Sequence, residues 1–147
     1  MPDPVSFSNR LNAQPEHEGF TFRETSGPPW HISCAVEKNG PDFMCRIHGG
    51  DRHVGAVALS ERRSGLVTTR ILVVGRHREG EIARHAAYRP GRAARSSVVV
   101  IAGIHFDSPS KHDIEQIEDS VSRLALRAAQ AIRNHGPQVP GGATHPV

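Results

Sequence analysis

Several residue types and motifs are scarce in this sequence, and each scarcity excludes a class of protein. The chain has 147 residues but only two cysteines, Cys34 and Cys45, whose spacing is not C-x-x-C, so neither a disulfide scaffold nor a zinc ribbon is indicated. The longest apolar run, residues 98–104, is far too short to cross a membrane. The N-terminus lacks the basic and apolar regions of a signal peptide. We therefore expect a soluble, cytoplasmic protein with reduced thiols.

The signatures of several enzyme classes are absent as well. The sequence contains no H-E-x-x-H motif, no G-x-x-x-x-G-K-[ST] phosphate loop and no G-x-S-x-G nucleophile elbow. Lysine occurs only at Lys38 and Lys111, so Schiff-base chemistry is not favoured. Between Arg46 and Arg95 the only aromatic residue is Tyr88, whereas proteins that bind single-stranded nucleic acid interleave aromatic and basic side chains.

Histidine and arginine, by contrast, are abundant. The chain has ten histidines and sixteen arginines, and its net charge of +3 is unevenly distributed: −3 over residues 1–45, +7 over 46–95 and −1 over 96–147. A positive block in mid-chain attracts phosphate, a carboxylate substrate or nucleic acid. Most charged side chains are simply solvated, and a GC-rich genome also produces an arginine excess.

The apolar pattern predicts strands in the first half of the chain. Alternating or β-branched segments predict strands at residues 20–25, 30–37, 43–48, 54–60 and 68–74. The second and third are expected to pair as a hairpin, and residues 48–55 are expected to form a glycine-rich loop between strands.

The second half of the chain combines helices with one further strand. A helix is expected from residue 78 to Arg89, ending before Pro90 and followed by a short further turn of helix. The β-branched run 96–104 predicts a central strand buried on both faces. The clearest amphipathic helix follows, capped by Ser108 or Ser110, with its apolar stripe at Ile114, Ile117, Val121, Leu124, Ala128 and Ile132.

This order of elements predicts an α+β fold with two layers. We expect a mixed, mostly antiparallel sheet with the two main helices on one face, and with the other face solvated or covered by a partner. Residues 19–136 are expected to form a single domain. A flexible N-terminal tail, residues 1–18, and a disordered C-terminal tail, residues 137–147, are expected to flank it.

Three histidines lie where predicted strands end. His53 belongs to the glycine-rich loop, His77 lies between a strand and a helix, and His105 follows the buried strand. Three converging imidazoles would form a site suited to Zn, Fe or Mn. An isolated histidine at such a position is more often structural, so the metal site depends on their convergence. The other seven histidines are expected to be structural, exposed or in the tails.

Arginines and glycines accompany two of these histidines. Arg52 precedes His53, and Arg76 and Arg78 flank His77 at the predicted start of a helix. A helix N-terminus and a glycine-rich turn both present backbone N–H groups to a phosphate, and arginine adds charged donors.

Three ordered segments resemble those of the prenylated flavin chaperone family, which includes the small D subunit (LpdD-like) associated with gallate and related hydroxyarene decarboxylases. They are Gly49-Gly-Asp-Arg-His-Val-Gly-Ala-Val57, Gly75-Arg-His-Arg-Glu-Gly-Glu-Ile82 and Val100-Ile-Ala-Gly-Ile-His-Phe-Asp107, within a resemblance that spans about residues 30–132. The resemblance implies a non-decarboxylating accessory protein that binds prenylated FMN and helps to deliver or mature it for a UbiD-type decarboxylase. We also expect a homo-oligomer.

The residues and the resemblance together predict a site without catalytic residues. The expected cofactor-binding residues are Gly50, Arg52, Gly55, Arg76, Arg78 and Gly103, and the expected ligands of a divalent or ferric metal are His53, His77 and His105. One alternative is a small metal-dependent enzyme that uses the three histidines, with Glu79, Glu81 or Asp107 as acid or base. Another is a nucleic-acid-binding module driven by residues 46–95, whose affinity would fall steeply with salt.

Overall fold

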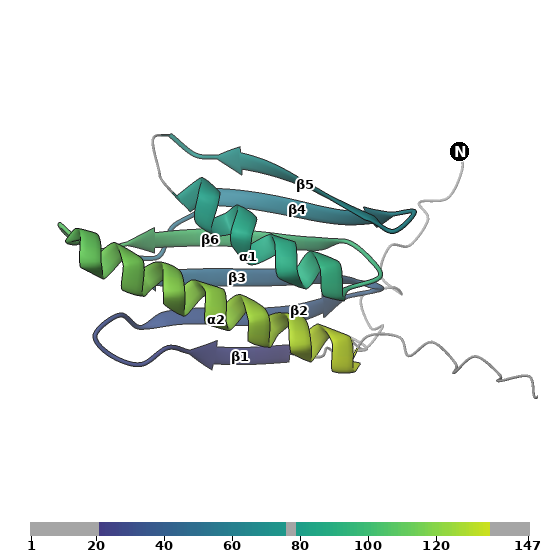
Figure 1. The fold of residues 1–147 in the computed structure, drawn as a ribbon, viewed down its shortest axis with the longest axis horizontal. Coiled ribbons are helices and arrows are strands. Elements are labelled where there is room, and N and C mark those ends of the chain that lie inside the picture. The colour runs from purple at the N-terminus through teal and green to yellow at the C-terminus, as the bar shows by residue number, and fades with distance from the viewer. Residues whose placement is uncertain (1–20, 76–78, 136–147) are drawn as a thin grey trace, which may run out of the picture.

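A computed structural model describes residues 21–75 and 79–135, which form one sheet covered on one face by two helices (Figure 1). The elements are β1 (Thr21–Thr25), β2 (Ile32–Asn39), β3 (Asp42–Gly50), β4 (Ala56–Arg63), β5 (Leu66–Val73), α1 (Glu79–Ala93), β6 (Val98–His105) and α2 (Lys111–His135). The strand order is β1-β2-β3-β6-β4-β5, in which only β3 and β6 pair in parallel. The predicted α+β fold is thereby confirmed. The tails predicted at residues 1–18 and 137–147 lie outside the described residues.

The predicted β2–β3 hairpin is present, and its alternating residues supply much of the core. Ile32, Cys34 and Val36 of β2 face the helices, as do Phe43, Cys45 and Ile47 of β3. The Sγ atoms of Cys34 and Cys45 lie 3.6 Å apart as free, buried thiols. The hydrogen bond between them, together with burial, raises the pKa of the Cys45 thiol.

The central position of β6 is confirmed, but its predicted burial on both faces is wrong. Val98, Val100 and Ala102 are fully buried beneath the helices, whereas Val99 and Ile101 on the opposite face are only half-buried. The reason is that both helices cover the same face of the sheet (Figure 1). The β-branched run 96–104 therefore predicts the central position of the strand correctly, but it does not show that the other face of the sheet is open.

The helix α1 also departs from the prediction, because it continues through Pro90 to Ala93 instead of ending near Arg89. Pro90 is completely buried, and its carbonyl accepts a hydrogen bond from the Ala94 N–H at 2.9 Å. Next to it, Gly91 lies so close to β4 that a Cβ would overlap the side chain of Ser60. Packing against the sheet thus outweighs the cost of a proline in a helix, about 3 kcal/mol.

The helix α2 begins with the cap expected of Ser110. The Ser110 Oγ accepts a hydrogen bond from the Asp113 N–H at 3.1 Å, and an Asp113 carboxylate oxygen accepts one from the Ser110 N–H at 2.8 Å. The Ser110 hydroxyl also donates to the Asp113 carboxylate at 2.7 Å, and this bond, followed by that from the Ser110 N–H, lowers the pKa of Asp113. The predicted apolar stripe faces the core, with Ile114 half-buried. Neither helix in the described part of the chain has the length and apolarity to span a membrane.

Candidate functional site

The loop of residues 51–55, which connects β3 to β4, lies against the C-terminal end of β6. This contact requires a glycine at position 103, because a Cβ there would overlap the carbonyl of His53, with the carbonyl carbon only 2.8 Å away. The Gly55 N–H donates to the Ala102 carbonyl at 2.9 Å and fixes the other end of the loop. The glycine at position 103 and the hydrogen bond of Gly55 therefore help to position the loop that carries the His53 side chain.

The predicted loop 48–55 is shorter than expected, because Gly49 and Gly50 are the last residues of β3 and pair with β6. Gly50 has a φ of 67°, in the left-handed region that favours glycine. A Cβ at Gly50 would overlap the His105 carbonyl. Gly50 and Gly103 thus allow β3, the loop and β6 to approach closely at one end of the sheet.

His53 is held by two oxygen acceptors. Its Nδ1 lies 2.9 Å from the carbonyl oxygen of Asp51, and its Nε2 lies 3.2 Å from the carboxylate atom Oε1 of Glu79, in the first turn of α1. Glu79 is only 5% exposed, and a Cβ at Gly55 would come within 2.9 Å of its carboxyl carbon. Because a carbonyl and a carboxylate only accept, both bonds together require an imidazolium. The Asp51 hydrogen bond, and then Glu79, accordingly raise the pKa of His53 despite its desolvation.

We expect a Glu79→Gln substitution to lower the pKa of His53, because it removes the charge that favours the imidazolium. The folded-state pKa lies above the unfolded value of about 6.5, so His53 stabilises the fold below that pH. This contribution is lost as the pH rises through the folded-state pKa. An NMR titration of the His53 ring measures the shift, with Glu115→Gln as the control. An unchanged His53 pKa in Glu79→Gln would show that the contact has no electrostatic effect.

Two of the three predicted metal ligands lie side by side, and the third, His77, lies outside the described residues. The ring centroids of His53 and His105 are 6.2 Å apart and their planes are nearly perpendicular. The Nε2 of His105 lies 3.6 Å from a carboxylate oxygen of Asp107. Within residues 21–75 and 79–135, no group of three or more His, Cys, Asp or Glu side chains is arranged to hold a metal ion. A metal at His53 would have to replace one of its present bonds, and the metal site stays a prediction.

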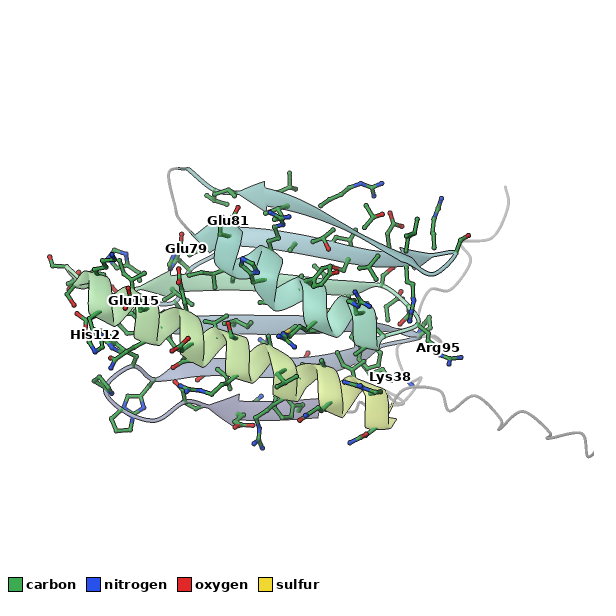
Figure 2. All side chains as sticks on the ribbon, viewed as in Figure 1. Lys38, Glu79, Glu81, Arg95, His112 and Glu115 are labelled. Atoms are coloured by element: carbon green, nitrogen blue, oxygen red, sulfur yellow. The ribbon has the colours of Figure 1, made fainter. Side chains whose placement is uncertain are left out.

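A cavity of about 340 Å³ lies beside this contact, at the first turns of both helices and the end of β6. Its apolar lining is made by Ile82, Ile104, Phe106, Pro109, Ile114 and Ile117, and its polar lining by Glu79, Glu81, His105 and Glu118. Figure 2 shows Glu79 and Glu81 at the start of α1, at the same end of the molecule as the start of α2. The volume is at the lower end of the range for small-molecule sites, about 300–1,000 Å³.

Arg52, the expected phosphate ligand, lies on the opposite face of the sheet from the helices. There it lines a depression of about 180 Å³, which we call the basic depression, together with Arg23, Thr25, Ser33, Cys34, Ala35, Arg46 and His48. Sequence reasoning treated His48 as structural or exposed and did not single out Arg23 or Arg46. Alternation of buried and exposed residues shows that Arg23, Arg46 and His48 face away from the core. Only the register between the strands shows that they are neighbours.

Two further expected phosphate ligands, Arg76 and Arg78, lie outside the described residues. Of the alternative acid or base residues, Glu79 contacts His53, Glu81 lines the cavity and Asp107 is near His105. Sequence reasoning missed the apolar lining contributed by Ile104, Phe106 and α2. Their part in the cavity depends on how the helices pack against the end of β6, which the local sequence pattern does not express.

Comparisons with known proteins agree with this architecture. Among solved structures, a chain from a chaperone complex for yeast 20S proteasome assembly is similar, with a TM-score of 0.60 and 10% identity over 78% of this chain and 98% of that chain. A likeness at this identity shows a common fold alone. No curated protein matches the chain significantly. A family model described as "Prenylated flavin chaperone LpdD-like domain" matches residues 26–133, most of the chain. The chain therefore belongs to the family of LpdD-like prenylated flavin chaperone domains.

Proposed function

We propose that this protein binds prenylated FMN in the cytoplasm and delivers or matures it for a UbiD-type aromatic acid decarboxylase, without catalysing decarboxylation itself. The observation that carries the proposal is the family match over residues 26–133. The described residues add a cavity and a histidine contact at one end of the sheet.

The chemistry of the described residues fits a modified flavin nucleotide. The ring system of a flavin is largely apolar with a polar edge, and the cavity combines an apolar lining with His105. Arg52 offers a charged donor for a phosphate, on the opposite face of the sheet. When bound, prenylated FMN supplies the chemistry that the partner enzyme uses to add or remove CO2. The part played by this chain is to bind the cofactor, orient it and shield it from water.

A protein partner is supported by the open edge of the sheet. Leu66 and Leu72 of the edge strand β5 are 74% and 76% exposed, and Leu59 of β4 is 39% exposed. Exposed leucines on an edge strand mark surfaces that pair with other chains. We assign this edge to protein contacts, either with the decarboxylase or with a second copy of the chain in the expected homo-oligomer.

We expect the wild-type protein to co-elute with reduced prenylated FMN under anaerobic conditions, followed by absorbance and mass. Ile114→Gln places an amide in the apolar lining and is expected to weaken binding about tenfold. Glu115→Gln, on the exposed neighbouring residue, is the matched control. Transfer of the bound cofactor to a decarboxylase free of cofactor is measured by the activity gained. Absence of co-elution, with or without divalent metal, would refute the proposal.

The metal-dependent enzyme is the second candidate, and the contact between His53 and Glu79 is the observation that favours it. A histidine bonded to a carboxylate is common both beside metals and in proton transfer. Metal analysis of the same protein samples separates the two functions, because the enzyme requires a metal that His105→Ala would release. Equal metal content in wild type and variant would remove His105 as a ligand.

A further inference from the structure

The basic depression is a hollow on the open face of the sheet, formed by side chains of three strands and by Arg52 of the 51–55 loop. Register aligns Arg23 of β1 with Ala35 of β2 and Arg46 of β3, and it aligns Thr25 with Ser33 and His48. These residues alternate with the core residues, so they share the face opposite the helices. The middle strand contributes Ser33, Cys34 and Ala35, which have short side chains, and the flanking strands contribute the long basic side chains of Arg23 and Arg46. A hollow with basic walls is the result.

Positive charge is concentrated here without an equal number of acids. Arg23, Arg46 and Arg52 line the hollow with His48, and the acid paired with one of them is Glu37, whose Oε1 lies 2.6 Å from Arg46. Desolvation, followed by the charges of Arg52 and Arg46, lowers the pKa of His48. The basic groups therefore act on one another across the hollow. Such mutual repulsion is relieved when an anion occupies the space between them.

Hydroxyl groups complete the polar lining. The Thr25 Oγ1 and the Ser33 Oγ lie 2.9 Å apart at the end of the hollow nearer His48. Hydroxyls and guanidinium groups are donors to phosphate oxygens, and arginine binds phosphate through two parallel bonds. At about 180 Å³ the hollow is smaller than pockets that enclose a whole ligand. Its size and chemistry suit one anionic group of a larger molecule, or a free anion.

We propose that the basic depression is a phosphate-binding site in which Arg23, Arg46 and Arg52 hold a phosphate monoester or inorganic phosphate. If the phosphate belongs to the flavin nucleotide, that assignment rests on the proposed function. The binding of phosphate itself does not, because it follows from the charges and geometry of this face alone. The depression is distinct from the apolar cavity, with which it shares no lining residue.

Calorimetric titration with inorganic phosphate, FMN and riboflavin tests the proposal on the full chain. We expect Arg46→Gln and Arg52→Gln each to weaken phosphate binding about three- to tenfold, since each removes a charged donor that is partly exposed. Arg133→Gln, an equal change of charge on the exposed surface of α2, is the matched control and is expected to bind as wild type. Circular dichroism confirms that each variant is folded.

A variant that binds phosphate more tightly is a useful control, because misfolding would weaken phosphate binding and could not strengthen it. Glu37→Gln removes the acid that competes for Arg46, so phosphate is expected to bind about threefold more tightly. Phosphate is also expected to raise the pKa of His48, which NMR measures, because the anion favours the imidazolium. Equal phosphate affinity in wild type, Arg46→Gln and Glu37→Gln would overturn the site.

The three titrants separate the two sources of phosphate. Binding of FMN that exceeds binding of riboflavin, and that falls in Arg46→Gln, supports the flavin nucleotide as the occupant. Phosphate binding that depends on Arg46 without preference for FMN supports a site for free phosphate, and it leaves the proposed function to its own co-elution test. Prenylated FMN that co-elutes equally with wild type and Arg46→Gln would overturn the flavin assignment while the proposed function stands.

Discussion

Replacing Gly103 with alanine is expected to lower the free energy of unfolding by about 1–3 kcal/mol and to displace the loop that carries His53. The new Cβ would overlap the His53 carbonyl, which is backbone and unable to rotate away. Either the loop moves off the sheet or β6 shifts against β3. In both cases the pairing of His53 with Glu79 is disturbed, and prenylated FMN binding is expected to weaken with it.

Denaturant unfolding and the NMR signals of the His53 ring measure the two parts of this effect. Gly27→Ala is the matched control, because a Cβ at Gly27 would meet no atom within 4 Å and its stability is expected to change by less than about 0.5 kcal/mol. A Gly103→Ala protein with wild-type stability and an unchanged His53 environment would show that the close approach is not required.

Replacing Phe43 with alanine is expected to lower the free energy of unfolding by about 3–5 kcal/mol, the largest single effect that we predict. Phe43 is 1% exposed and is the largest of the fully buried side chains. It lies near the start of β3, whereas Gly50 ends that strand beside the site. The substitution leaves a cavity in the core without altering the groups around His53, so the folded fraction is expected to retain wild-type affinity for cofactor.

Leu126→Ala is the control for this substitution. Leu126 is 39% exposed on α2, and alanine is the residue most compatible with a helix, so the expected loss is below about 1 kcal/mol. Chemical denaturation measured for both variants under one set of conditions gives the comparison. Equal losses would contradict the assignment of Phe43 to the buried core, and altered cofactor affinity in folded Phe43→Ala would contradict its separation from the site.

Local patterns in the sequence predicted most of the secondary structure. The alternation of Ile32, Cys34 and Val36 and the stripe of α2 both follow from one buried face, which each segment carries in its own residues. The continuation of α1 through Pro90 was not predictable in this way. It depends on the fit of Gly91 against Ser60, and those positions are brought together only by the complete fold.

In the candidate site, too, some residues could be predicted from local sequence and others depend on the complete fold. His53, His105 and Glu79 were identified because each stands at the end of a strand or the start of a helix, and such ends meet at one edge of a sheet. The basic depression was missed because Arg23 and Arg46 become neighbours only through the registers of β1 with β2 and of β2 with β3. Register is set by pairing between segments and is not expressed in any one of them.

The position of β6 has a consequence for how the molecule assembles. Its pairings with β3 and β4 are the ladders that join the β1–β2–β3 meander to the β4–β5 hairpin in the described sheet. The β3–β6 ladder joins residues more than fifty positions apart, so we expect its closure to be slower than that of the hairpins. Because Gly103 and His105 arrive with that strand, a chain that has not inserted β6 has no assembled site. Under the proposed function, cofactor binding is expected to report on completed folding, and a nascent chain is expected to gain it only after β6 has been synthesised.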